Sequence, residues 1–337
     1  MALTDPNSVL VRDYLQNVSM LYRNAEYVAD QIFPIIPNGT GGLNPTAKVG
    51  KYLKGPWFRD EAEPRAPGTP ARVGEFKITS SNLDPVNYAF ASTVPDEERR
   101  NANIPSSFPL QPDIDALQYI AEKLDIKKEV RASAVLHATA WGGQAAGGVD
   151  AEGHWGDATA GNDTFLADIR TARDSIRSNT GILPNTLFLT WEAWSALQVA
   201  PALLALMNPQ ALSANSLVQV NTLSALIGMT IIIGSAVKNT DEETVADSSF
   251  TPVNIWGTSG AETKGVGFIY YKPASVGLRI PSAGYQYRIA QINGQGRMST
   301  TWRDDARHAD MYDTQEDTDF SAVGLDLGYM FKDTCTT

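Results

Sequence analysis

The middle of the chain first shows the apolar spacing of a helix. Four apolar residues recur at intervals of three or four: Phe165, Ile169, Ala172 and Ile176. This spacing predicts one buried face of a helix that residues 162–164 cap. Gly181 and Pro184 then end the helix, because glycine readily adopts the left-handed conformation and proline cannot continue a helix.

Two short apolar runs follow, and each has the length of a buried strand. Residues 186–189 and 228–234 flank a second helix, which Thr190 can cap and Pro201 interrupts. Helix, strand, helix and strand in this order predict a compact α/β unit over residues 163–234. The long segments on either side must pack around this unit.

A much longer helix is predicted before the unit, from Asp113 to about Thr139, roughly 40 Å at 1.5 Å per residue. Its expected apolar stripe is Leu117, Ile120, Ala121 and Leu124, continuing with Val130, Ala134 and Ala138. Residues 142–161 are rich in glycine and alanine and are interpreted as a linker.

The N-terminal third changes pattern twice. Residues 5–33 have the spacing of short amphipathic helices without a partner nearby, and residues 34–70 carry prolines that exclude a long helix. Residues 75–79 and 86–90 then alternate apolar and polar positions, as half-buried strands do. The two together predict a long two-stranded excursion from the body of the protein.

The C-terminal third reads mainly as strands. Strands are expected at residues 268–271, 276–280, 285–289 and 323–329. The acidic residues between 304 and 319 lack the central glycine and closing glutamate of a calcium loop, so we interpret this segment as a solvated acidic turn.

Charge and composition narrow the function. The 337 residues are 43% hydrophobic and carry a formal charge of −11, so a large core is expected and tight binding to nucleic-acid phosphates is not. Cys335 is the single cysteine and excludes an internal disulfide. No signal peptide and no membrane span are expected from the apolar runs.

Catalytic and metal-binding patterns are sparse. His137, His154 and His308 are the three histidines, and no two have the spacing of metal ligands. No dinucleotide-binding fingerprint, phosphate-binding loop or nucleophile elbow occurs. We therefore predict no enzyme activity, no cofactor and no metal, and expect the function to lie in surfaces.

Ten residues of the proline-rich excursion form the predicted assembly interface. An aromatic pair and a charged tip are followed by a charged base: Trp57, Phe58, Arg59, Asp60, Glu61, Arg65, Glu97, Glu98, Arg99 and Arg100. Exposed ion pairs within one subunit contribute only about 0–1 kcal/mol, whereas charges at an interface set register. Reversing Arg99 and Arg100 is therefore expected to leave subunit stability nearly unchanged and to disturb assembly.

The order of these parts resembles the major capsid proteins of tailed bacteriophages, with the Hong Kong 97-like fold. The local similarity lies in a helix, a Gly-Pro-Asn turn and a strand over residues 169–189, continuing to Trp194 and Leu197. Trp302-Arg-Asp-Asp305 and residues 328–333 are similar to the C-terminal segment of that family.

The resemblance implies an α+β fold with five parts. Residues 1–48 would form an N-terminal arm and residues 49–110 an extended β-hairpin loop. Residues 111–183 would form a peripheral domain with a long spine helix, and residues 184–280 an axial domain. Residues 281–337 would return to the peripheral domain.

The function implied by the resemblance is self-assembly. Pentamers and hexamers would form an icosahedral shell around double-stranded DNA, without sequence-specific binding and without a membrane. A separate scaffolding protein, a portal and a decoration protein are the implied partners, with assembly in the bacterial cytoplasm and residence in the virion. Two alternatives stay open: a soluble α/β enzyme, and another phage structural protein such as a decoration or tube protein.

Overall fold

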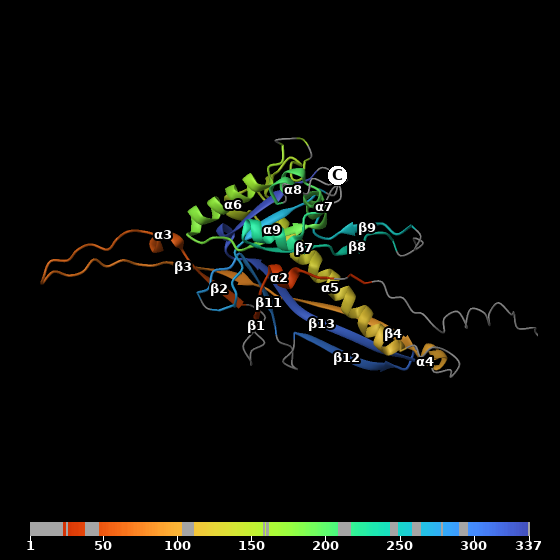
Figure 1. Ribbon diagram of the computed structural model, residues 1–337. Helices are drawn as coiled ribbons and strands as arrows, with labels where there is room; N and C mark the ends of the chain where they lie inside the picture. The colour runs from red at the N-terminus through yellow and green to blue at the C-terminus, as the bar shows by residue number, and fades with distance from the viewer. Residues whose placement is uncertain are drawn as a thin grey trace, which may run out of the picture.

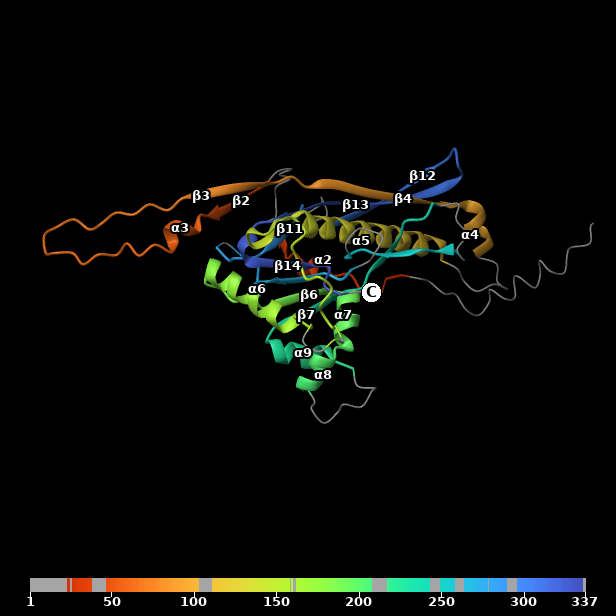
Figure 2. The ribbon, with the colours of Figure 1, turned by 90° about the horizontal axis from the view of Figure 1, so that it is seen from above.

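The computed structural model describes residues 23–24, 26–37, 47–102, 111–157, 159, 162–207, 217–242, 249–257, 264–277, 279–289 and 296–335. A body of two sheets and a long helix carries a thin loop that projects far beyond it (Figure 1). Seen from above, helices α7, α8 and α9 form a narrow end on the side of the body opposite β4 and β12 (Figure 2).

The first sheet is organised around β13 (Ala309–Ala322), a strand of 14 residues. One side of β13 pairs with β4 (Val86–Pro95), and the other pairs with β12 (Arg297–Asp304) and then β11 (Gly284–Arg288). The short strand β1 (Ile35–Pro37) lies parallel to β11 and completes the sheet. The acidic segment is therefore a strand and not the turn predicted from its charge.

The second sheet contains the strands of the mid-chain unit. Its order is β5 (Val149–Asp150), β14 (Gly328–Lys332), β10 (Gly267–Tyr270), β6 (Thr186–Thr190) and β7 (Thr230–Gly234). The C-terminal strand β14 thus pairs beside β10, within the sheet of the mid-chain unit. A separate two-stranded sheet joins β8 (Val237–Asn239) and β9 (Pro252–Asn254).

The predicted helices of the mid-chain unit are confirmed. Helix α6 (Phe165–Thr180) buries the four predicted apolar residues, and Gly181 ends it with a left-handed φ of 69°. Three shorter helices follow: α7 (Trp191–Gln198), α8 (Pro201–Met207) and α9 (Val220–Ile227). Residues 208–216, between α8 and α9, lie outside the described residues.

The long helix α5 (Pro112–Ala138) is also confirmed, but its buried face differs from the predicted stripe. Leu117, Ala134 and Ala138 are exposed, whereas Glu129 and Ser133 are buried. The charged and hydroxyl side chains are buried because they find hydrogen-bond partners: Trp256 Nε1 donates to Glu129 Oε2 at 2.6 Å, and Ser133 Oγ donates to the Ile255 carbonyl at 2.8 Å. Apolar periodicity alone could not reveal these pairings.

The segment interpreted as a linker is packed into the body instead. It begins with the short 3-10 helix η1 (Trp141–Gly143), and both Trp141 and Trp155 are buried. Trp155 lies against Phe165 and Phe331, with ring centroids at 5.1 and 5.4 Å. The glycines allow close approach: a Cβ at Gly148, whose φ is +86°, would lie 2.5 Å from the Met330 carbonyl oxygen.

The extended excursion exists, but its strands pair differently from the prediction. Strand β2 (Ala47–Tyr52) pairs with β3 (Ile78–Leu83), whereas β4 joins the first sheet. Between β2 and β3 the chain forms the short helix α3 (Lys54–Trp57) and runs out and back as the projecting loop (Figure 1). Helix α4 (Asp96–Ala102) follows β4.

Two further expectations for the C-terminal third are corrected. Residues 276–277 and 279–280 are not in a strand, and Leu278 lies outside the described residues. The predicted strand at 323–329 is instead the 3-10 helix η3 (Leu325–Leu327) followed by β14. Apolar alternation over so few residues does not distinguish one continuous strand from a short 3-10 turn followed by a strand.

The N-terminal segment reaches the core only through its last part. Helix α2 (Ala29–Ile32) buries Ala29 and Ile32, and the neighbouring Val28 and Phe33 are also buried. Residues 1–22, which carry most of the predicted arm, lie outside the described residues.

Candidate assembly interface

Exposed aromatic rings gather where the projecting loop leaves β2 and β3. Trp57 and Phe76 keep 63% and 62% of their surface exposed. Their ring centroids lie 6.2 Å apart, and Tyr52 lies 5.8 Å from Trp57 and 6.0 Å from Phe76. We call Tyr52, Trp57 and Phe76 the loop aromatic cluster. Rings so exposed contribute little to the core of one subunit, and clusters of this kind mark interaction sites.

Phe58, the second predicted aromatic, points elsewhere. Two thirds of its surface is exposed, and its ring lies close to Gly181 at the end of α6. Lys54 of α3 also reaches the body, where its Nζ lies 2.9 Å from Asp326 Oδ2. The base of the loop is therefore attached to the body at α6 and η3.

The charged residues of the loop tip pair among themselves. Arg59 Nη1 lies 2.9 Å from Glu61 Oε1, and Arg72 pairs with Glu63. Asp60 and Arg65 are exposed. Six basic and four acidic residues lie between 51 and 77, so this segment is positive in a chain whose net charge is −11.

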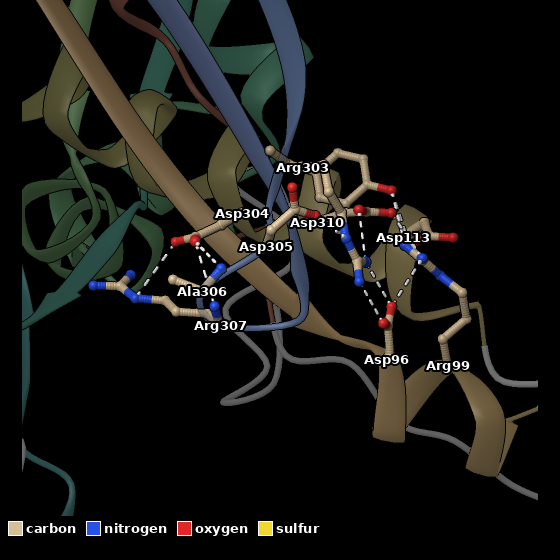
Figure 3. A network of polar contacts seen from close by, with 10 residues as sticks. Asp96, Arg99, Asp113, Arg303, Asp304, Asp305, Ala306, Arg307 and Asp310 are labelled. Atoms are coloured by element: carbon tan, nitrogen blue, oxygen red, sulfur yellow. Dashed lines mark hydrogen bonds and ion pairs between the residues drawn. The ribbon is translucent and has the colours of Figure 1, made fainter.

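The second group of predicted charges belongs to a network that joins four elements, α4, α5, β12 and β13 (Figure 3). Arg303 of β12 binds both carboxylate oxygens of Asp96, at 2.7 and 2.5 Å. Arg99 of α4 reaches Asp113 of α5 and Asp310 of β13, both at 2.7 Å. The network fastens α4 to the end of the first sheet and to the start of α5.

Hydrogen bonds complete this attachment of α4. Tyr312 donates its hydroxyl to Asp113 Oδ1 at 2.9 Å, and the backbone N–H of Asp96 donates to the His308 carbonyl at 3.0 Å. In the adjacent turn the backbone N–H of Ala306 donates to Asp304, whose carboxylate also lies near Arg307 (Figure 3).

The arginines keep the network's carboxyl groups ionised. The hydrogen bond from Arg303 lowers the pKa of Asp96 from 3.8 to about 2. Arg99 likewise lowers the pKa of Asp113 and of Asp310. The cause is the same in each case, because a guanidinium that donates to a carboxylate favours its charged form.

The structure separates the predicted interface residues into two places. The loop residues 57–65 and the helix α4 with residues 97–100 lie at opposite ends of the molecule in both views (Figures 1 and 2). Glu97, Glu98 and Arg100 are exposed on α4. Arg99 is paired with Asp113 and Asp310 of its own subunit and does not lie free at an interface, so its reversal should lower subunit stability, contrary to the expectation from the sequence.

Sequence reasoning missed the partners in this network. Asp96 and Asp113 lie in a different third of the sequence from Arg303 and Asp310, with 207 positions between Asp96 and Arg303, and no spacing rule links the two groups. The available signal was the Arg-Asp-Asp run at residues 303–305, but its meaning depends on the pairing of β12 with β13.

A row of aspartates lies on one side of the first sheet, where Asp319 accepts a hydrogen bond from the backbone N–H of Asp84 at 3.1 Å. Along β13, Thr314, Glu316, Thr318 and Phe320 are buried. Strand alternation therefore places Asp313, Asp317 and Asp319 on the other side of the sheet, away from these buried positions. We call these three aspartates the acidic sheet face.

Among the residues that the structure describes, no cluster of histidine, cysteine and acidic side chains could hold a metal ion. The described helices include none of the length and apolar character needed to cross a bilayer.

Comparisons of the fold and of the sequence give different results. No protein-family model matches the sequence, and no curated protein sequence matches it. The structure is similar to a phage-related protein from Bordetella bronchiseptica RB50, with 20% identity, 94% coverage of each chain and a TM-score of 0.65. It is also similar to the capsid structure of the cyanophage P-SCSP1u, with 10% identity, coverage of 98% and 95%, and a TM-score of 0.61.

A third similar structure is the capsid of the Myoviridae phage XM1, with 11% identity, coverage of 95% and 97%, and a TM-score of 0.54. Similarity over nearly the whole of each chain at such low identity reflects shared architecture rather than shared sequence. The chain therefore has the α+β capsid fold of the tailed phages that its sequence resembles.

Proposed function

We propose that this protein is a shell subunit, which assembles into pentamers and hexamers that close an icosahedral capsid around double-stranded DNA. The observation that carries the proposal is the loop aromatic cluster on a projection that its own subunit leaves exposed. The capsid fold supports the same function, which is structural and not enzymatic.

The charges of the loop and of the sheet suggest how copies meet. The loop segment 51–77 is positive, whereas the acidic sheet face presents three aspartates on the body. Opposite charges of this kind steer association and fix register between subunits. The loop of one subunit lies, in this proposal, across the first sheet of the next, where the aromatic rings lose their exposure to water.

The acidic chain also suits a container for DNA. A net charge of −11 repels phosphates at long range, so the shell encloses the genome without holding it. The division into arm, loop, peripheral and axial domains, and the separate scaffolding, portal and decoration proteins, belong to the same proposal. So does assembly in the host cytoplasm before residence in the virion.

The proposal is tested by electron microscopy and sedimentation of the purified protein, alone and with its scaffolding protein. We expect closed particles or capsomers from the native sequence. Small closed oligomers under every condition would support the enzyme alternative and contradict the proposal. Open tubes would support the alternative of a tube protein.

Loop variants test the interface itself. Trp57→Asp with Phe76→Asp should leave the melting temperature almost unchanged, because both rings are largely exposed, and should abolish particles. The matched control is Ala62→Asp with Ala71→Asp, which adds the same charge at exposed positions of the same loop. Normal particles from the aromatic variant would show that the loop aromatic cluster is not an interface.

A further inference from the structure

Helix α5 is covered on one side along most of its length and on a second side along only part of it. Strands β4 and β13 pack on the first side. The N-terminal segment covers the second side: the backbone N–H of Asn24 donates to Glu122 at 3.1 Å, and that of Ala29 donates to Glu129 at 2.7 Å. Lys128 and Asp30 add an ion pair of 3.0 Å. This cover begins at Glu122 and continues toward the end of the helix.

The same side of α5 is bare before Glu122, among the residues that the structure describes. Gln118 and Ile114 precede Glu122 by four and eight residues, so they continue the same ridge of the helix. Ile114 keeps 47% of its surface exposed, and Leu117, one turn away, keeps 36%. We call Ile114, Leu117 and Gln118 the bare face of α5.

The sequence that precedes Asn24 has the pattern needed to cover this face. Leu10, Tyr14, Val18 and Leu21 recur at intervals of four and three, which is the spacing of one apolar face of a helix. If the arm docked nowhere, its own apolar face would be exposed to water. The bare face of α5 also presents apolar side chains, and it lies close to Asn24, where the arm joins the described part of the chain.

The position of Asn24 favours the arm of the same chain over that of another. Asn24 is held at Glu122 and also at Val237, where it accepts from the backbone N–H at 3.0 Å. From Glu122 to Ile114 is eight residues of helix, roughly 12 Å at 1.5 Å per residue. A tether this short gives the attached arm a high effective concentration at the bare face.

We propose that residues 5–22 dock through their apolar face on the bare face of α5 in the same subunit. The arm then extends the cover that residues 23–33 already provide, and α5 becomes buried on both sides along its whole length. This proposal concerns the unassembled subunit and does not depend on shell formation.

Hydrogen–deuterium exchange on the unassembled full-length chain tests it. Leu10→Asp with Tyr14→Asp and Val18→Asp should speed amide exchange in residues 112–121 at least tenfold. The matched control, Ser8→Asp with Gln16→Asp and Ser19→Asp, adds the same charge on the opposite face and should change nothing. Equal exchange in the apolar-face variant and the native chain would overturn the proposal.

A reciprocal variant guards against indirect effects. Ile114→Asp with Leu117→Asp should speed exchange in residues 5–22, while Leu226→Asp, another exposed leucine on α9, should not. The melting temperature of each variant verifies that the body stays folded. Slow exchange of the arm that appears only at high protein concentration or in particles would assign it to a second copy, and would overturn docking within one chain.

Discussion

At the residue scale, Trp155 shows how a residue read as part of a linker becomes part of the core. Only 1% of its surface is exposed, and its Nε1 donates to Asp168 Oδ2 at 2.8 Å. Its ring lies directly over Gly267 of β10, where a Cβ would collide with it. The ring thereby joins α6 to the second sheet.

Replacing Trp155 by alanine should lower the free energy of unfolding by about 3–5 kcal/mol, as expected for a large aromatic residue removed from a core. Trp191→Ala is the matched control, because Trp191 is 49% exposed. This change should lower the free energy of unfolding by only about 0.5 kcal/mol. Chemical denaturation measures both. Similar losses in the two variants would contradict the structural difference between the two tryptophans.

Glu129 is the other residue whose setting the sequence did not reveal. It is fully buried between α5, α2 and Trp256, and burial raises its pKa from 4.5 to about 7. The native state therefore holds the proton more tightly than the unfolded chain does. The stabilisation is complete below pH 4.5 and is lost as the pH rises to about 7.

Glu129→Gln should remove this pH dependence. Between pH 4.5 and 7 the unfolding free energy of the native protein should fall, relative to the variant, by about 1–3 kcal/mol. Denaturation curves at several pH values give the difference in unfolding free energy between the native protein and the variant. The other carboxyl groups contribute equally to both proteins and drop out of this difference. A constant difference across this range would show that Glu129 titrates as it does in the unfolded chain.

At the scale of elements, the sequence predicted those whose signals are local. Although α5 begins at Pro112 and Asp113 does not cap it, helices α5 and α6 and strands β6 and β10 follow from the spacing of apolar residues and from the residues that end them. Strand β13 did not, because aspartate and glutamate are poor strand formers and its ten-residue pairing with β4 joins distant segments. The pairing of β2 with β3 was missed because it also joins segments that are not adjacent in the sequence.

Helix α4 depends on such a distant pairing, and Arg99→Glu tests it. The new carboxylate would lie among Asp96, Asp113 and Asp310, so the melting temperature should fall by a few degrees. Arg100→Glu is the matched control on the same helix, where the exposed side chain should leave the melting temperature unchanged. Thermal unfolding of the two unassembled variants measures the difference. Equal melting temperatures would show that the network does not hold α4 in place.

At the scale of the whole molecule, the order of the projecting loop, the long helix and the mid-chain unit was predictable, although many of the contacts between them were not. This order appears in the sequence as changes of period and of proline content. For the candidate interface, the sequence could predict which set of residues would be exposed but not where they would lie in space. The division of that set between the loop and α4, and the engagement of Arg99 within its own subunit, require contacts between residues more than 200 positions apart.

The sheet pairings also determine when the chain can fold during its synthesis. Strand β1 needs β11, β4 needs β13, and β14 lies between β5 and β10. Each five-stranded sheet thus requires strands from the last sixty residues, and contacts so distant in sequence form slowly. A ribosome that has synthesised the chain only as far as β10 carries two incomplete sheets with open edges. Completion of both sheets therefore waits for β11 to β14, and the nascent chain before that point is the species that chaperones must protect from aggregation.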